Sequence, residues 1–560
     1  MLNSSILLLK NYGFQMNFTT LDYVVFAIYI LGIIFLGLWV SRTKKGHERD
    51  SKDYFLAGKT LPWWAIGASL IAANISAEQF IGMSGSGFAI GLAIASYEWM
   101  AALTLIIVGK YFLPIFIEKG LYTIPEFIEK RFSTNLKTIL AIFWVSLFIF
   151  VNLTSVLFLG GKAIDTIIGN GDGGLIFYSI LGLAFIAAAY SLWGGLSAVA
   201  WTDIAQVVLL IFGGLITTFL ALEYVTPEGG VIHGFSHILN VAGNKFHMIL
   251  TKDNPEFYNL PGIAVLIGGM WVANLYYWGF NQYIIQRTLA SKSIKQGQRG
   301  ILFAAFLKLL IPILVVIPGI VAYVLFTQPE GTTIMPGVKE AFLKNGGGIN
   351  YDKAYPWLIK TFVPVGFKGL VLAALTAAIV SSLASMLNST STIFTMDIYK
   401  PYLNKNATEK TLVRIGRIAA AAALVIAIVL APLLGNIPQM FQYIQEYTGL
   451  VSPGILGVFL MGLFWKKTTN KGAIVGVVLS IFVAFVLKMP AIDLPWMDQM
   501  MYTLLITMVI IAGVSLTTSE NVDDPKGIPL TAKMFKTDSV FNAGSYLLMI
   551  ILAVLYTVFW

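Results

Sequence analysis

Cysteine is absent from the 560-residue chain, and histidine occurs only four times. Disulfides, thiol nucleophiles and cysteine-ligated metals are therefore excluded. His233 and His237 lie four residues apart and could share a metal, although exposed loop histidines are the simpler interpretation. Charged residues are also scarce, at 12% of the chain against about 25% in soluble domains. HExxH motifs, DxD motifs and paired catalytic carboxylates are missing too, so we do not expect an enzyme. The remote alternative is a membrane-embedded enzyme that acts on lipid-linked sugars.

Hydrophobic residues make up 57% of the chain and gather in long runs. Because a membrane-spanning helix needs about 20 mostly apolar residues, this pattern predicts an all-α polytopic membrane protein with about fourteen transmembrane helices. The expected spans are 21–41, 62–88, 92–117, 137–163, 173–193, 196–222, 261–284, 300–326, 364–394, 412–434, 438–465, 471–489, 497–516 and 541–559.

Basic residues favour one set of connecting segments. If the N-terminus lies outside, the inner segments hold 26 of the 37 Lys and Arg residues. These segments are 42–61, 110–137, 287–299, 400–417, 466–471 and 517–540. The positive-inside rule then places both termini outside the membrane. It also accounts for the net charge of +9 without a nucleic-acid partner.

Two of the expected spans are interrupted by polar residues, which are costly at bilayer depth unless they face protein, water or ligand. In the second span these residues are Asn74, Ser76, Glu78 and Gln79. In the seventh span they are Asn274, Tyr276, Tyr277, Asn281 and Gln282. Helices broken in this way line the substrate sites of many transporters.

The two broken spans lie five spans apart, so they start from opposite sides of the membrane. Many transporters contain two five-helix repeats of inverted topology, each opening with a broken helix, and we expect that arrangement here. The expected parts are an N-terminal segment with an extra first helix and a basic inner loop (1–50), a first repeat (51–225), an outer loop (226–260), a second repeat with its own outer loop at 327–363 (261–465), and three C-terminal helices (466–560).

The ninth span carries a candidate cation site. Ala378, Ser381 and Ser382 are spaced by three and four residues, which places them on one helix face. Their oxygens, together with carbonyls freed by the break in the second span, suit a weakly bound monovalent cation such as sodium. A divalent ion usually requires carboxylates. The alternative is that these small residues only allow close helix packing.

Four further polar residues lie in or near spans, namely Glu98, Asp203, Lys308 and Gln445. An ionisable residue inside a membrane is a candidate functional residue, and carboxylate, ammonium and carboxamide groups can hydrogen-bond the hydroxyls of a neutral sugar. Glu98 and Lys308 could instead form a structural ion pair, and Asp203 could cap a helix. Lys162 is expected to extend its ammonium group to the membrane surface.

Five stretches of the sequence are distinctive. They are Ala72–Met83 (AANISAEQFIGM), Ala95–Met100 (ASYEWM), Asn274–Arg287 (NLYYWGFNQYIIQR), Ala377–Asp397 (AAIVSSLASMLNSTSTIFTMD) and Phe441–Pro453 (FQYIQEYTGLVSP). Through them the chain, from about Leu21 to Trp560, resembles the sodium/solute symporter family, and within it the bacterial sodium/galactose (sodium/glucose-type) transporters. The resemblance implies a LeuT-type core of fourteen helices.

The resemblance also implies roles for individual residues. Sodium would be held by Ala72, Ile75, Ala378, Ser381 and Ser382, and it would leave past Asp203. The sugar would contact Asn74, Gln79, Glu98, Asn274, Lys308 and Gln445. The inner gate would be Tyr277, steadied by Asn281, and the outer gate would be Met83, Tyr97 and Phe441. Similar sugar sites often have a serine where this chain has Ala101, which leaves the preferred sugar and its affinity open.

Together these features predict a sodium-coupled symporter for a galactose- or glucose-type monosaccharide in the bacterial cytoplasmic membrane, carrying one sodium ion per sugar. A monomer is expected to suffice, with a homodimer as the alternative. Two rival functions stay open. One is transport of an amino acid, a vitamin or sialic acid by the same scaffold, and the other is passive facilitation of sugar transport. An anionic substrate should recruit an arginine at mid-membrane, and a passive facilitator needs no cation site.

Overall fold

The computed structural model describes residues 17–40, 61–120, 123–226, 228–328, 337–344, 347–435, 437, 439–518 and 522–560. Within these ranges the protein is helical, and its extended pairing consists of isolated bridges at Leu61–Ser291 and Leu343–Ile349. The predicted inner loop 42–61 lies, apart from Leu61, outside the described residues.

Ten described helices are long and apolar enough to cross a membrane, and a bent pair brings the number to eleven. The ten segments are Thr20–Gly37, Leu92–Glu118, Thr134–Ile167, Ala200–Tyr224, Ile294–Thr327, Phe367–Leu403, Glu409–Leu434, Asn470–Leu487, Trp496–Thr518 and Ser539–Val558. The bent pair, α21 (Met440–Gly449) and α22 (Ser452–Phe464), turns by 48°. The helical class is confirmed, whereas the count of fourteen is not, because the remaining predicted spans are broken or short.

Several of the ten segments are built from named elements. They include α2 (Thr20–Val40), α6 (Ser96–Ile107), α9 (Thr134–Ser146) with η5 (Leu147–Leu153) and α10 (Thr154–Ile167), α16 (Ile294–Thr327), α19 (Phe367–Ile393) with η9 (Phe394–Leu403), α20 (Glu409–Leu430), α23 (Asn470–Leu487), α24 (Trp496–Thr518) and α25 (Ser539–Val558). The predicted spans 173–193 and 196–222 both fall in one element, α11 (Ile176–Tyr224).

The predicted break in the second span is present. Helix α4 (Trp63–Asn74) ends at Ile75, which has extended backbone angles, and the chain resumes as the π-helical turn η2 (Glu78–Met83) and α5 (Ser84–Ala89). Asn74, Ser76 and Gln79 are buried here. The Gln79 side-chain oxygen accepts a hydrogen bond from the Ser76 N–H (3.0 Å), which stabilises the turn between the two helical parts.

The seventh span is interrupted at two points. The short helix α13 (Ala264–Ile267) ends at Gly268, after which α14 (Gly269–Leu275) and η7 (Tyr276–Phe280) follow. Asn281 is extended, and α15 (Gln282–Leu289) starts directly after it. A Cβ atom at Gly269 would lie 2.1 Å from the Met497 carbonyl oxygen, so this glycine allows α14 to touch α24.

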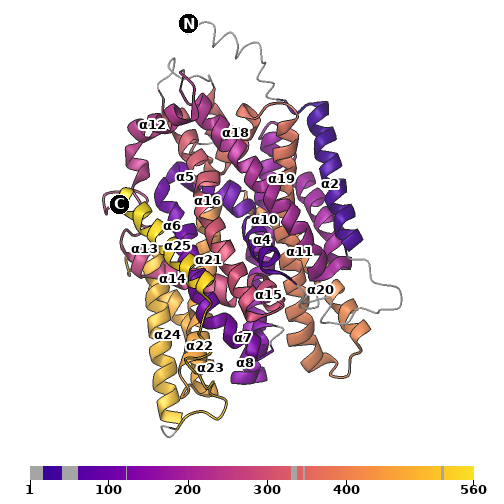
Figure 1. The fold of residues 1–560 in the computed structure, drawn as a ribbon, viewed down its shortest axis with the longest axis vertical. Coiled ribbons are helices and arrows are strands. Elements are labelled where there is room, and N and C mark those ends of the chain that lie inside the picture. Colours follow the sequence, from indigo (N-terminus) through magenta and orange to yellow (C-terminus); the bar gives the residue numbers. More distant parts are fainter. Residues whose placement is uncertain are drawn as a thin grey trace.

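Short helices cover the two ends of the bundle. Figure 1 shows α12 (Val231–Val241) and α18 (Ala354–Phe362) at the upper end, and α7 (Leu113–Glu118), α8 (Ile124–Arg131) and α23 at the lower end. At the upper end the 3-10 turn η8 (Tyr351–Lys353) lies against α5, since a Cβ atom at Gly85 would be 2.9 Å from the Tyr351 carbonyl.

Candidate functional site

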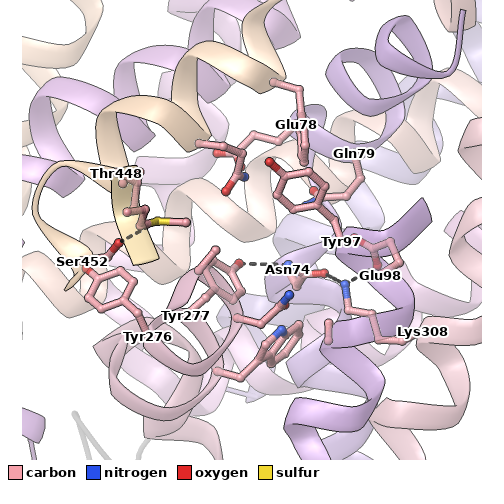
Figure 2. A pocket seen from close by; sticks show the side chains of 18 residues that line it. Asn74, Glu78, Gln79, Tyr97, Glu98, Tyr276, Tyr277, Lys308, Thr448 and Ser452 are labelled. Atoms are coloured by element: carbon pink, nitrogen blue, oxygen red, sulfur yellow. Dashed lines mark hydrogen bonds and ion pairs between the residues drawn. The ribbon is translucent and has the colours of Figure 1, made fainter. Parts of the chain in front are cut away.

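A cavity of about 550 Å³ lies where both broken spans meet α6, α16 and α21 (Figure 2). All six predicted sugar contacts line it: Asn74, Gln79, Glu98, Asn274, Lys308 and Gln445. The predicted gate residues Tyr97, Tyr277 and Phe441 line it as well, and so does Ala101. The structure therefore brings together residues from segments as far apart as α4 and α21.

Lys308 of α16 stands at the centre of the polar network. Its ammonium group is buried and donates hydrogen bonds to the Glu98 carboxylate and to the Asn74 side-chain oxygen (Figure 2). It also lies 4.9 Å from the centre of the Trp278 ring. The alternative interpretation of Glu98 and Lys308 as an ion pair is thus realised, and the pair forms part of the cavity wall.

Tyr277 is held from two sides. Its hydroxyl accepts a hydrogen bond from the Asn74 side-chain amide (3.0 Å) and another from the Tyr283 hydroxyl (2.6 Å). Asn281, the predicted partner of Tyr277, follows η7, and its side-chain oxygen has no hydrogen-bond partner among the described residues. Sequence reasoning missed Tyr283, which lies six residues beyond Tyr277 and on the far side of the helix break.

The predicted outer gate is a compact apolar contact. The rings of Tyr97 and Phe441 meet edge to face with their centres 4.9 Å apart. Met83 is fully buried at the end of η2 but is not among the residues that line the cavity. A Cβ atom at the neighbouring Gly82 would lie 3.1 Å from the Phe441 Cβ atom, so η2 and α21 are in direct contact.

The predicted cation ligands gather behind the break in α4. Ala72, Ile75, Ala378, Ser381 and Ser382 are all buried. The Ser382 hydroxyl donates to the Ala73 carbonyl (3.1 Å), which connects α19 to the last turn of α4. Because a hydroxyl that donates one hydrogen bond keeps two lone pairs, Ser382 can still offer its oxygen to a cation.

Asp203 differs from the predicted helix cap. It lies inside α11, is fully buried, and pairs with the guanidinium group of Arg287 from α15 at 3.1 Å. It also accepts hydrogen bonds from Ser69 (2.5 Å) and Ser381. Arg287 donates further to Ser385 (2.5 Å). Counting Arg287 as an inner-loop residue was wrong, since it is a buried arginine whose charge is balanced by Asp203.

Lys162 is a second correction. It does not reach the membrane surface but is buried and pairs with Asp352 of η8 at 3.2 Å. The cavity also includes Glu78, which the sequence located at the break without a binding role, and Thr448 and Ser452, which sequence reasoning left out. The sequence signal for Glu78 was present, because a carboxylate in a broken span is unusual, whereas Thr448 and Ser452 flank a helix bend that hydropathy does not reveal.

Comparison with known proteins places the chain in a family. The model described as "Sodium:solute symporter family" matches residues 54–480. The chain belongs to this family. It is therefore a transporter rather than an enzyme, and it is an integral membrane protein, as the sequence predicted.

Similar proteins cover most of the chain. A sodium/glucose cotransporter of Vibrio parahaemolyticus is 64% identical over 540 residues, which are 96% of this chain and 98% of that protein. Sodium/myo-inositol cotransporter 2 of Mus musculus is 34% identical over 83% of this chain and 69% of its own. A solved Na+-coupled sialic acid symporter in an outward-open state has a TM-score of 0.75 at 22% identity, covering 90% of this chain and 98% of its own, which supports the same fold.

Proposed function

We propose that the protein uses an inward sodium gradient to take up a galactose- or glucose-type monosaccharide. The observation that carries this proposal is the cavity between the two broken spans, next to which the Ser382 hydroxyl of α19 meets the Ala73 carbonyl at the end of α4. The 64% identity to a sodium/glucose cotransporter over nearly the full length of both chains supports both the ion and the sugar.

The cavity wall suits a neutral polyol. Lys308 supplies N–H donors, Glu98 supplies acceptor oxygens, and the carboxamides of Gln79, Asn274 and Gln445 supply both. Since the Lys308 and Glu98 charges cancel across one contact, this part of the site calls for no opposite charge on the ligand. The Tyr277 ring offers an apolar face on which a pyranose can stack.

Sodium would bind between α4 and α19, at the carbonyls of Ala72, Ile75 and Ala378 and the hydroxyls of Ser381 and Ser382. Asp203 would then assist its exit. Coupling requires that sodium raises the affinity for the sugar, and reciprocally. One charge crossing 100 mV supplies about 2.3 kcal/mol, and a tenfold sodium gradient adds about 1.4 kcal/mol. One ion per sugar could thus support accumulation of a few hundred-fold.

We also infer the arrangement in the membrane. The fourteen-helix, inverted-repeat architecture would follow if α4 to α5, α13 to α15 and the two halves of α11 each count as spans. Both termini would face outward, in the cytoplasmic membrane of a bacterium. The two expected outer loops supply α12 and α18, which lie at the opposite end of the bundle from α7, α8 and α23 (Figure 1), as this orientation requires.

The test is uptake of radiolabelled galactose and glucose by proteoliposomes under an inward sodium or an equal potassium gradient. Sodium-driven accumulation above equilibrium is expected, and Ser382→Ala should abolish it. Ser545→Ala is the matched control, because Ser545 is a buried serine of α25 whose hydroxyl donates to the Phe541 carbonyl of its own helix. Equal equilibration in both salts would indicate a facilitator, and sodium-dependent uptake of a different solute would discard the sugar.

A further inference from the structure

Glu78 is the one charged residue of the cavity wall for which the described structure shows no opposite charge. The charged side chains that line the cavity are Glu78, Glu98 and Lys308. Lys308 is already paired with Glu98. Glu78 is only 7% exposed, and its Oε1 atom has no hydrogen-bond partner. A buried carboxylate in this condition is expensive unless something neutralises it.

Among the described groups around Glu78, the one positive charge is that of Lys308, which is paired with Glu98, and the others supply hydrogen bonds alone. The side chain of Asn152, from η5, hydrogen-bonds one Glu78 oxygen. The phenols of Tyr277 and Tyr283 face it from η7 and α15 and bond to each other. Tyr97 and Glu98 line the same cavity from α6, Lys308 lines it from α16, and Gln445 lines it from α21.

Two further buried cations are also paired with other carboxylates. Arg287 is engaged by Asp203, and Lys162 is engaged by Asp352. A sodium ion at the candidate site would contact carbonyls and hydroxyls of α4 and α19 rather than Glu78. A proton or a positively charged ligand inside the cavity is therefore the direct way to balance this carboxylate.

Resting on the proposed sugar transport, we propose that Glu78 is a specificity-determining residue that pairs with the ammonium group of a cationic monosaccharide. The substrates of this cavity then include amino sugars, in which an ammonium group replaces one hydroxyl. An ammonium group donates three hydrogen bonds and carries a full charge, so it satisfies the free Oε1 atom and balances the carboxylate in one contact. With a neutral sugar, Glu78 has to take up a proton instead.

The experiment compares galactosamine with 2-deoxygalactose as competitors of sodium-driven galactose uptake in proteoliposomes. The two competitors differ at carbon 2 by the ammonium group. The wild-type protein should favour galactosamine, and direct uptake of labelled galactosamine should depend on sodium. In Glu78→Gln the potency of galactosamine should fall at least about tenfold, while that of 2-deoxygalactose changes little. Glu78→Asp keeps the charge and should keep the preference.

Acidity supplies a second readout that uses the wild-type protein alone. Because protonation removes the charge of Glu78, the preference for galactosamine should shrink as the pH falls. If Glu78→Gln does not fold, the pH series on the wild-type protein still tests the proposal. An equal response to both competitors in the wild type at every pH would overturn the proposal, and so would an unchanged ratio in Glu78→Gln.

Two other failures are distinguishable from these outcomes. If Glu78 served the sodium ion instead, Glu78→Gln would raise the half-saturating sodium concentration equally for both sugars and leave their ratio unchanged, which rejects the proposal. If no neutral sugar is taken up in a sodium-dependent manner, the proposed function itself fails, and the inference about amino sugars falls with it.

Discussion

The Lys308 ammonium group contacts acceptors from two helices. For this single residue, the cost of burying its charge away from water decides how much its contacts contribute to stability. Removing one partner of a buried ion pair strands the other charge and costs about 3–5 kcal/mol, whereas replacing both is often nearly neutral. The sequence located Glu98 and Lys308 and offered two interpretations for them. Geometry was needed to show that they bond each other and share Asn74.

We therefore predict that Glu98→Gln and Lys308→Met, made singly, each lower the free energy of unfolding by about 3–5 kcal/mol. The double variant should lose less than the sum of the two. Thermal unfolding of the purified protein, arranged as a double-mutant cycle, measures this coupling. Additive losses would mean that the two groups do not depend on each other. Sugar affinity should fall in all three variants.

At the scale of helices, close backbone approach decides which elements can be neighbours. A Cβ atom at Gly319 of α16 would lie 2.1 Å from the Ser84 carbonyl oxygen of α5. A Cβ atom at Gly513 of α24 would meet nothing within 4 Å. Both glycines lie inside helices, but a neighbouring helix crowds only Gly319.

We predict opposite outcomes for alanine at these two positions. Gly319→Ala should push α16 away from α5 and destabilise the protein by about 1–3 kcal/mol. Gly513→Ala should leave stability unchanged or raise it by about 0.5–1 kcal/mol, because alanine favours the helix. Unfolding midpoints of the two variants provide the comparison. Similar shifts in both would refute the close contact as the cause.

The sequence predicted helix interruptions better than helix ends. Polar residues at Asn74 and Gln79 located the first break correctly, because polar side chains are rare at mid-span unless they face protein, water or ligand. The seventh span breaks at Asn281, one of the polar residues that the sequence indicated, and also at Gly268, which the polar pattern did not indicate. Ion pairs such as Asp203–Arg287 join residues 84 positions apart, and a single sequence does not encode such pairings in any local pattern.

At the scale of the whole molecule, a connection between α24 and α25 crosses the lower end. Asp524 lies 3.4 Å from Arg131 of α8, and Asp538 lies 2.7 Å from Arg299 of α16. Arg131 also donates to the Gly462 carbonyl (2.9 Å) at the end of α22. The connection therefore contacts one helix from each predicted repeat, α8 and α16, and Arg131 links α8 to the end of α22.

Acid should loosen this connection at Asp538. Burial raises the pKa of this carboxyl, but the Phe541 backbone N–H and the Arg299 guanidinium lower it more, so the pKa lies below its ordinary value of 3.8. A lowered folded-state pKa gives stability that is present above the unfolded value and is lost as the pH falls through the folded value. Asp538→Asn retains a helix cap but should remove this acid-dependent part.

The measurement is the unfolding midpoint of wild type and Asp538→Asn from neutral pH down to the acid limit of the detergent-solubilised protein. At neutral pH the variant should lose only about 0.2–1 kcal/mol, as is typical of partly exposed ion pairs. The difference between the two proteins should begin to shrink near about pH 4 and vanish as the pH falls through the lower folded-state pKa of Asp538. A constant difference at all pH values would assign the effect to the helix cap alone.

The opposite end of the molecule carries the Lys162–Asp352 pair, which ties α10 to the η8 turn that lies on α5. Since α5 is the half of the first broken span that η8 contacts, this pair should help to limit access to the cavity from that end. The natural absence of cysteine allows a direct test with one introduced thiol. Thr448 lines the cavity without belonging to the predicted sugar contacts, so Thr448→Cys reports access.

Lys162→Met in the Thr448→Cys background should speed labelling of the thiol by a membrane-impermeant reagent applied to whole cells. Breaking the pair leaves the Asp352 carboxylate buried and uncompensated, which favours states in which η8 separates from α5 and the carboxylate reaches water. Lys252→Met, at an exposed outer-loop lysine, is the matched control and should not change the rate. Equal rates in both variants would show that closure on this side rests on the packing of Tyr97 against Phe441 instead of the ion pair.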